Sequence, residues 1–197
     1  MRIILASASL SRAQLLRSVG VAFEVEPANI DEDAIKERIS RTGASPDTIA
    51  IELAEHKAKM VSSTHLHDLV IAGDQILWFD GDLISKCGTM DEARSLLVRL
   101  RGRSHTLIGG LALARGGEIL WRHSSRAELI MRDFSDGFLE RYLDREGTRL
   151  LGSVGCYRLE GEGAQLFDAI DGSYFAILGL DMLPLLRALR AHKAIAA

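Results

Sequence analysis

The opening stretch of the chain, residues 2–20, reads RIILASASLSRAQLLRSVG and combines three features in order. Residues 2–6, an arginine followed by an apolar run, predict a short buried strand. Three serines and an arginine follow, and a helical pattern then runs up to Gly20, which provides a C-terminal cap. Because a helix N-terminus presents free N–H groups, Ser9 and Arg12 beside it favour a phosphate site. In the alternative interpretation, Ser9 only caps the helix.

Outward from this stretch, helical and extended patterns alternate, with turn residues between them. Helices are expected over about residues 45–62, 89–100, 135–144 and 183–193, with a charged turn or short helix over residues 31–39. Extended segments are expected over about residues 22–28, 69–73, 76–79, 83–85, 105–114 and 118–132, and on both sides of a turn at Asp171-Gly172. Asp74-Gln75 interrupts one apolar strand, and Asp80-Gly81 predicts a hairpin. The mixture predicts a single α/β domain over residues 1–197, with a mixed β-sheet and flanking helices.

The composition excludes several classes of protein. Of the 197 residues, 47% are hydrophobic and 26% are charged, which is typical of a globular domain and excludes a disordered chain or a coiled coil. A net charge of −3 gives no overall attraction for nucleic acid, and the apolar runs are too short for a membrane span or a secretory signal. The distant cysteines Cys87 and Cys156 argue against a disulfide scaffold, so we expect a soluble cytoplasmic protein. The isolated histidines His105 and His123 lack zinc-ligand spacing and are interpreted as structural.

One lysine falls on the apolar face of the helix expected over residues 45–62. On a helical wheel, Lys57 lies near the centre of an arc of apolar residues, namely Ile49, Ala50, Leu53, Ala54, Met60 and Val61. An ammonium group there is costly unless it is paired or opens onto a cleft. We therefore interpret Lys57 as a cleft lysine; the alternative is a side chain that reaches past the apolar surface to solvent.

Other charged residues complete a candidate polyphosphate site. Asp74 stands inside the apolar run of residues 70–79, where a carboxylate needs a partner or a role. The expected hairpin brings the region around Lys86 back toward Asp74. The acidic run of residues 31–33 is either a solvated turn or a source of oxygen ligands for Mg²⁺. Together with the lysine, arginine and hydroxyls described above, this set suits chemistry on a polyphosphate.

Short motifs are spread over nearly the whole chain. They are Leu5-Ala6-Ser7-Ala8-Ser9-x-x-Arg12-x-x-Leu15-Leu16, Asp31-Glu32, Ala54-x-x-Lys57-Ala58, Ala72-Gly73-Asp74-Gln75, Ser85-Lys86, Gly102-x-x-His105, Gly155-Cys156-Tyr157-Arg158-Leu159-Glu160-Gly161, and Gly172-Ser173-Tyr174 with Gly179-Leu180. In this order they resemble the Maf family of nucleoside triphosphate pyrophosphatases. Any one motif is weak, whereas the ordered set is specific.

The resemblance implies a fold, an activity and a set of site residues. The fold has two lobes around a central cleft, and the protein is often a homodimer. The activity is hydrolysis of a nucleoside triphosphate to the monophosphate and pyrophosphate, which is thought to remove non-standard nucleotides. Asp74 aligns with the family's catalytic proton acceptor, and Arg12, Glu32, Lys57 and Lys86 align with its remaining active-site positions. A divalent cation, Mg²⁺ or Mn²⁺, is expected to bridge phosphate oxygens and carboxylates that include Glu32.

Three loops depart from the family pattern. Leu10 and Ser11 stand where the family usually has proline and then arginine or tryptophan. Cys87 and Asp181 each stand where proline is usual. Since a lost proline loosens a loop and leaves the charges in place, we expect activity to survive.

The resemblance also bears on which base is bound. Ser11 falls where the family reads its substrate, and Gln75 and Glu160 resemble the branch that prefers 7-methyl-GTP. The pyrimidine-preferring branch tends to carry Thr and Gln at those two positions. Glu160 is expected to accept hydrogen bonds from guanine N1–H and N2–H₂, while Gln75 donates to O6. Positive charge from methylation at N7 would favour Glu160 further. In the alternative interpretation, Glu160 only pairs with Arg158 or another cation.

Three other functions stay open at this point. The first is a nucleotide-binding regulator of cell division with little turnover, for which the substituted loops are the support. The second is a phosphatase that releases orthophosphate from small phosphoesters, and the third is a pyrimidine-preferring pyrophosphatase acting on dTTP or UTP. Asp74, Lys57 and Lys86 favour catalysis over binding alone.

Overall fold

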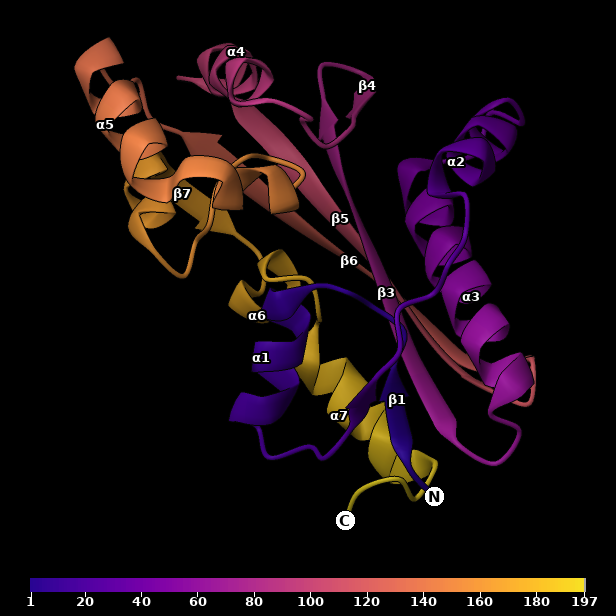
Figure 1. The fold of residues 1–197 in the computed structure, drawn as a ribbon. Helices are drawn as coiled ribbons and strands as arrows, with labels where there is room; N and C mark the ends of the chain where they lie inside the picture. The colour runs from indigo at the N-terminus through magenta and orange to yellow at the C-terminus, as the bar shows by residue number, and fades with distance from the viewer. Residues whose placement is uncertain (197) are drawn as a thin grey trace. The chain divides into compact units, whose positions relative to one another are not determined.

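The fold consists of a β-sheet with helices around it, described for residues 1–196 by a computed structural model (Figure 1). Its helices are α1 (Leu10–Ser18), α2 (Glu32–Ser40), α3 (Pro46–Thr64), α4 (Met90–Leu100), α5 (Asp136–Glu146), α6 (Tyr174–Ile177) and α7 (Met182–Ala191), with 3₁₀ turns η1 (Gly147–Gly152) and η2 (Glu162–Leu166). Its strands are β1 (Ile3–Leu5), β2 (Glu24–Val25), β3 (Leu69–Phe79), β4 (Asp82–Ile84), β5 (Ser104–Arg115), β6 (Glu118–Met131) and β7 (Phe167–Asp171).

The strands of residues 1–196 form one mixed sheet. Its order is β2-β1-β3-β5-β6-β7, and β4 pairs with β3 beside this path. Strand β1 lies parallel to both β2 and β3, whereas β4 is antiparallel to β3 and β7 is antiparallel to β6. The predicted α/β fold with a mixed sheet and flanking helices is confirmed.

The chain divides into two compact units. The first unit comprises residues 1–75, residues 108–125 and the segment from Ser173 onward. The second comprises residues 76–107 and 126–172. One boundary between the units falls inside β3, directly after Gln75.

Strand β1 connects two apolar cores in the first unit because its side chains alternate between its two faces. Ile3 and Leu5 pack with residues of α1 and α7, which are Ala13, Leu15, Leu16, Leu185, Ala188 and Leu189. Ile4 faces the other way and packs with Ala54, Ala58 and Val61 of α3. Figure 1 accordingly draws α1 and α7 on one side of β1 and α3 on the other. A parallel strand covered on both faces explains the unbroken apolar run at the start of the chain.

Three helices of the first unit begin at residues that the sequence marks as caps. The Ser9 hydroxyl accepts from the Arg12 backbone N–H at the start of α1. Asp31 caps α2 and Ser45 caps α3 in the same way, and Pro46 occupies the first turn of α3. These caps place Arg12 in the first turn of α1 and Glu32 at the first position of α2.

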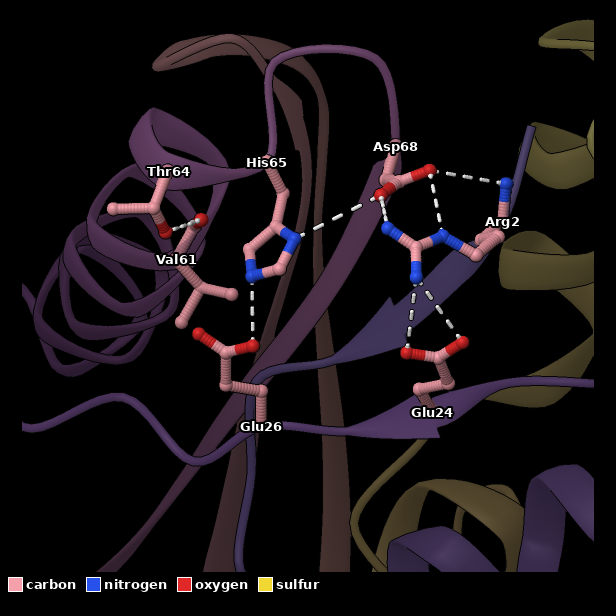
Figure 2. A network of polar contacts seen from close by, with 7 residues as sticks. All are labelled: Arg2, Glu24, Glu26, Val61, Thr64, His65 and Asp68. Carbon is pink, nitrogen blue, oxygen red and sulfur yellow. Dashed lines mark hydrogen bonds and ion pairs between the residues drawn. The ribbon is translucent and has the colours of Figure 1, made fainter.

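A polar network joins the beginning of β1 to its neighbours (Figure 2). Arg2 donates to Asp68 at 2.6 Å and to Glu24 at 3.4 Å, and His65 lies between Glu26 at 2.7 Å and Asp68 at 3.7 Å. The hydrogen bond from Arg2 holds the pKa of Asp68 below its ordinary value. The network ties the segment before β3 to β1 and β2.

The second unit is built around the predicted hairpin and a pair of packed helices. Asp80 and Gly81 adopt φ angles of 55° and 86°, which a two-residue turn between antiparallel strands requires, and Phe79 pairs with Asp82. Helices α4 and α5 pack against each other and against η1. Cys87 and Cys156 both belong to this unit and are free thiols.

Two expectations about the strands were wrong. Strand β3 runs without a break through Asp74 and Gln75, because the buried Asp74 carboxylate is paired and does not need to leave the sheet. Between Gly172 and residue 196 the chain forms helices α6 and α7 and no strand. There the Ser173 hydroxyl accepts from the Ala176 N–H and starts the short helix α6. Among residues 1–196, no helix is long and apolar enough to cross a membrane.

Candidate active site

A lysine bonded to two carboxylates forms the centre of the candidate site in the first unit. Lys57 Nζ donates to Asp74 Oδ1 at 2.6 Å and lies 2.9 Å from Glu32 Oε1. The side chains of Lys57 and Asp74 are only 8% and 6% exposed, whereas that of Glu32 is 41% exposed. Helix α3, strand β3 and helix α2 each supply one member of this trio. The structure thus brings together three residues predicted separately from the sequence.

The position of Lys57 follows from its place on the apolar face of α3. Its neighbours Ala54 and Ala58 are fully buried against β1 and β3, so the lysine stem enters the same core. A buried ammonium is tolerated when it is paired and hydrogen-bonded, and here two carboxylates do this. Two of its three N–H donors are engaged, which leaves one for a ligand. The trio carries one positive and two negative charges.

Arg12 provides a second cation in the same unit, with different partners. Its Nε donates to the Gly179 carbonyl at 3.0 Å and its Nη1 donates to the Ser7 hydroxyl at 3.0 Å. Within residues 1–196, no carboxylate oxygen lies within ion-pair distance of this guanidinium. Burial lowers the pKa of Arg12, and the nearby charges of Asp74 and Glu32 oppose that shift. A half-buried cation without an ion-pair partner is suited to hold an anionic ligand.

Gln75 lies next to Asp74 on β3 but does not offer the group that we expected. Its side-chain nitrogen donates to the carbonyls of Ala176 at 3.0 Å and Ile177 at 3.1 Å. Because a carbonyl only accepts, the amide orientation is fixed and both N–H donors are used. The expectation that Gln75 donates to a base is therefore wrong for this conformation, in which the side-chain oxygen is the group left for a ligand.

Ser9 and Ser11, the two serines predicted to bind substrate, both lie at the start of helix α1. The Ser9 hydroxyl accepts the Arg12 N–H at 3.4 Å, so the helix-capping interpretation holds for its oxygen. Ser11 lies in the first turn of α1 and is half-buried. Substrate contacts of either serine stay predictions.

Lys86 and Glu160 belong to the second unit, whereas the three residues of the trio belong to the first. Lys86 lies in an exposed segment between β4 and α4. Glu160 lies 3.3 Å from Arg158, which also donates to the buried Glu146 at 3.3 Å. The pairing of Glu160 with Arg158, held open from the sequence, is therefore present, and Arg158 is shared between two acids.

Sequence reasoning missed two residues that contact Arg12. Ser7 was noted only as part of a hydroxyl-rich turn, yet its oxygen accepts from both Arg12 and the Ser9 N–H. Gly179 contributes a backbone carbonyl, which no side-chain pattern reveals. Ser7 was quoted in the serine-rich motif and Gly179 in the motif Gly179-Leu180, but neither motif reveals a contact with Arg12.

Comparison with known proteins adds to this geometry. Residues 2–192 match the protein family that is described as "Maf-like protein". The chain belongs to the Maf family. This Maf chain is 47% identical over 195 residues to a protein from Granulibacter bethesdensis called nucleoside triphosphate pyrophosphatase, with 99% of each chain covered. A Caulobacter vibrioides protein of the same description is 48% identical over 193 residues, covering 98% of this chain and 96% of its own.

A third relative carries a narrower description. The Rhizobium meliloti protein called 7-methyl-GTP pyrophosphatase is 47% identical over 195 residues, covering 99% of this Maf chain and 98% of its own. Relatives with the broader and the narrower description are thus about equally similar to this chain. The resemblance drawn from the ordered motifs is confirmed at the level of the family.

Proposed function

We infer that this chain is a nucleoside triphosphate pyrophosphatase, a hydrolase that converts a nucleoside triphosphate to the monophosphate and pyrophosphate. One observation carries this function. Arg12 is a cation without an ion-pair partner within residues 1–196, and the charge of the buried Asp74 carboxylate acts on it. Lys57 holds that carboxylate in place. An anion-binding group beside a held base suits attack on a phosphate ester or anhydride. The names of the relatives from Granulibacter and Caulobacter support the same reaction.

The proposed reaction is in-line attack of water on the α-phosphorus. Asp74 Oδ1 is bonded to Lys57, and no hydrogen bond to Oδ2 occurs within residues 1–196, so Oδ2 is the oxygen that takes the proton from water. The remaining N–H groups of Arg12 bind phosphate oxygens, and the remaining N–H group of Lys57 stabilises the charge that develops on them. Lys86 is proposed to bind the departing pyrophosphate.

A divalent cation, Mg²⁺ or Mn²⁺, is part of the proposal. No group of three or more histidine, cysteine or acidic side chains in residues 1–196 is arranged to hold a metal. Mg²⁺, however, is commonly bound by one or two carboxylates together with substrate phosphates. Glu32 and Asp74 already converge on one positive charge, the Lys57 ammonium, so the donor set fits. Glu32 would hold the ion, which when bound supplies positive charge to the phosphate oxygens.

The proposed substrate is 7-methyl-GTP or a related modified purine nucleotide. Glu160 is proposed to accept the N1–H and N2–H₂ groups of the base, and its carboxylate favours the positive charge of a base methylated at N7. Gln75 retains an acceptor oxygen, which is also compatible with a base that presents N–H groups. The name of the Rhizobium meliloti relative supports this choice. Homodimer formation and removal of non-standard nucleotides stay predictions from family membership.

Product analysis tests the proposed function. Purified protein is incubated with Mg²⁺ or Mn²⁺ and a panel comprising 7-methyl-GTP, GTP, UTP, dTTP and ATP. Monophosphate and pyrophosphate in equal amounts, with fastest turnover of 7-methyl-GTP, are expected. Release of orthophosphate and diphosphate would indicate another kind of phosphatase. Binding without turnover would instead favour a nucleotide-binding regulator.

A further inference from the structure

The Arg12 guanidinium is held at two points, and its other N–H groups, which make no hydrogen bond within residues 1–196, form what we call its open edge. Nε donates to the Gly179 carbonyl at 3.0 Å and Nη1 donates to the Ser7 hydroxyl at 3.0 Å. Of the five N–H donors of an arginine, this uses two, on adjacent nitrogens. Both N–H groups of Nη2 and one of Nη1 remain, and they form the edge that can bind two oxygens of one phosphate group.

Ser7 itself is held in place by a second hydrogen bond, in addition to the one from Arg12. It directly follows the apolar run that contains β1, its residue is 8% exposed, and its oxygen also accepts the Ser9 N–H at 3.2 Å. Ser9 in turn caps α1, the helix that carries Arg12. A buried hydroxyl that accepts from both the guanidinium and the helix cap links the direction of the Arg12 side chain to the end of β1.

Gly179 approaches Arg12 so closely that a side chain would intrude. Its φ of +104° lies in a region that favours glycine, and a Cβ there would lie 3.0 Å from Arg12 Nε and 3.3 Å from its Cγ. The backbone carbonyl can thus reach the guanidinium where a larger residue would push it away. A long arginine side chain, which otherwise has many rotamers, is confined between these two contacts.

We propose that Ser7 is a positioning residue for substrate binding: together with the Gly179 carbonyl it aims the open edge of Arg12 at the triphosphate. This inference rests on the proposed function, in which Arg12 binds phosphate oxygens. Fixing the cation before the substrate arrives removes part of the entropy that binding would otherwise lose. Loss of the Ser7 hydroxyl therefore weakens binding of phosphate groups and leaves the chemical step largely intact.

The test compares Ser7→Ala, Arg12→Ala, the double variant and a matched control, Ser18→Ala. Ser18 lies on the same helix and donates to the Leu15 carbonyl at its far end, so it reports on the stability of α1 alone. KM and kcat are measured with the best nucleotide, and binding of inorganic pyrophosphate is measured by calorimetry. Ser7→Ala is expected to raise KM and the pyrophosphate Kd about tenfold, because binding must then order the Arg12 side chain, with little change in kcat. Ser18→Ala is expected to match the wild type.

The double variant decides between positioning and general structural damage. If Ser7 acts through Arg12, Ser7→Ala adds nothing to Arg12→Ala, whereas independent effects add. Ser7→Thr, which retains the hydroxyl, is expected to recover affinity relative to Ser7→Ala. Unchanged KM and Kd in Ser7→Ala, or a full additional loss in the Arg12→Ala background, would overturn the inference. Failure of the wild type to turn over nucleotides would count against the proposed function, while pyrophosphate binding would still test the role of Ser7.

Discussion

Lys57 Nζ lies 2.6 Å from Asp74 Oδ1, and this ion pair joins helix α3 to strand β3 in the interior of the first unit. Neither charge would be stable there alone, because a buried ion without a partner loses its hydration and gains nothing in return. The pair therefore has two consequences, one for catalysis and one for stability. They can be separated by changing one partner at a time.

Replacement of the proposed base is expected to stop turnover while sparing binding. Asp74→Asn keeps the shape of the side chain but removes the proton acceptor, so kcat should fall by at least about 10²-fold. Nucleotide affinity should be kept or increased, because a negative charge near the phosphates is lost. Steady-state kinetics together with calorimetric binding checks both. A variant with nearly normal kcat would assign Asp74 a structural role only.

Removal of the lysine is expected to affect both function and stability. Lys57→Met keeps the helix face apolar but leaves Glu32 and Asp74 without their shared cation. Nucleotide binding and turnover should both weaken, and the free energy of unfolding should fall by about 3–5 kcal/mol, as when one partner of a buried pair is removed. Urea denaturation measures the loss.

The double variant Lys57→Met/Asp74→Asn supplies the control. Since the second change removes the stranded buried charge, it should be less destabilised than the sum of the two single variants. Simple addition of the two losses would mean that the pair contributes no coupling energy. Wild-type affinity and rate in Lys57→Met would place Lys57 outside the substrate site.

The buried histidine of the second unit is expected to make the protein sensitive to acid. His105 bonds through Nε2 to the Tyr157 hydroxyl at 2.7 Å, and burial lowers its pKa from 6.5 to about 4. In the unfolded chain it binds a proton near pH 6.5, so the folded state gains stability above that pH and loses it as pH falls toward 4. The loss amounts to roughly 3 kcal/mol at most.

Thermal or urea unfolding between pH 4 and pH 8 measures this dependence. Because carboxylates also titrate toward the acid end, the informative quantity is the difference between the wild type and His105→Gln, which cannot gain a proton. The difference in unfolding free energy should shrink as pH falls from about 7 to about 4. A difference that does not change with pH would show that His105 keeps an ordinary pKa in the folded protein.

How far the sequence predicts this site depends on the kind of interaction. Helix caps at Ser9, Asp31 and Ser45 are local, and each was expected or follows directly from residue type. Lys57 was predicted from helical periodicity, because a charge on an apolar face stands out in one dimension. Its bonds to Glu32 and Asp74, which join residues far apart in the chain, appear only once the elements pack.

Two errors have the same origin. Asp74 was expected to break its strand, because the sequence does not show that its partner Lys57 lies on the neighbouring helix α3. Gln75 was expected to be a donor, since the carbonyls that use its N–H groups belong to α6, about a hundred residues later. A polar residue in an apolar run was recognised correctly, but its partners, and hence the group that it leaves for a ligand, depend on tertiary structure.

The choice of base is expected to respond to Glu160. Glu160→Gln should lower the preference for 7-methyl-GTP and raise the relative activity on UTP or dTTP, because a carboxamide can match the donor and acceptor pattern of a pyrimidine. Ratios of kcat/KM over the nucleotide panel measure the change. Since Arg158 also bonds Glu146, it keeps an acidic partner in this variant.

A neighbouring acid serves as the matched control for that substitution. Glu162→Gln changes an acid two positions away that pairs with Arg145 at 2.6 Å, and it should leave the ranking of nucleotides unchanged. If the wild type prefers UTP and dTTP, or if Glu160→Gln leaves the ranking as it was, the hydrogen-bonding argument for the base is wrong.

Hydrolysis in ¹⁸O-labelled water tests the central claim most directly, because it identifies the phosphorus atom that water attacks. The wild type, its best nucleotide and Mg²⁺ or Mn²⁺ are incubated in labelled water, and both products are examined by mass spectrometry, with Asp74→Asn run in parallel. Attack at the α-phosphorus predicts one ¹⁸O atom in the nucleoside monophosphate and none in the pyrophosphate, at a rate that Asp74→Asn reduces at least about 10²-fold. Label in the pyrophosphate or in orthophosphate would contradict the account.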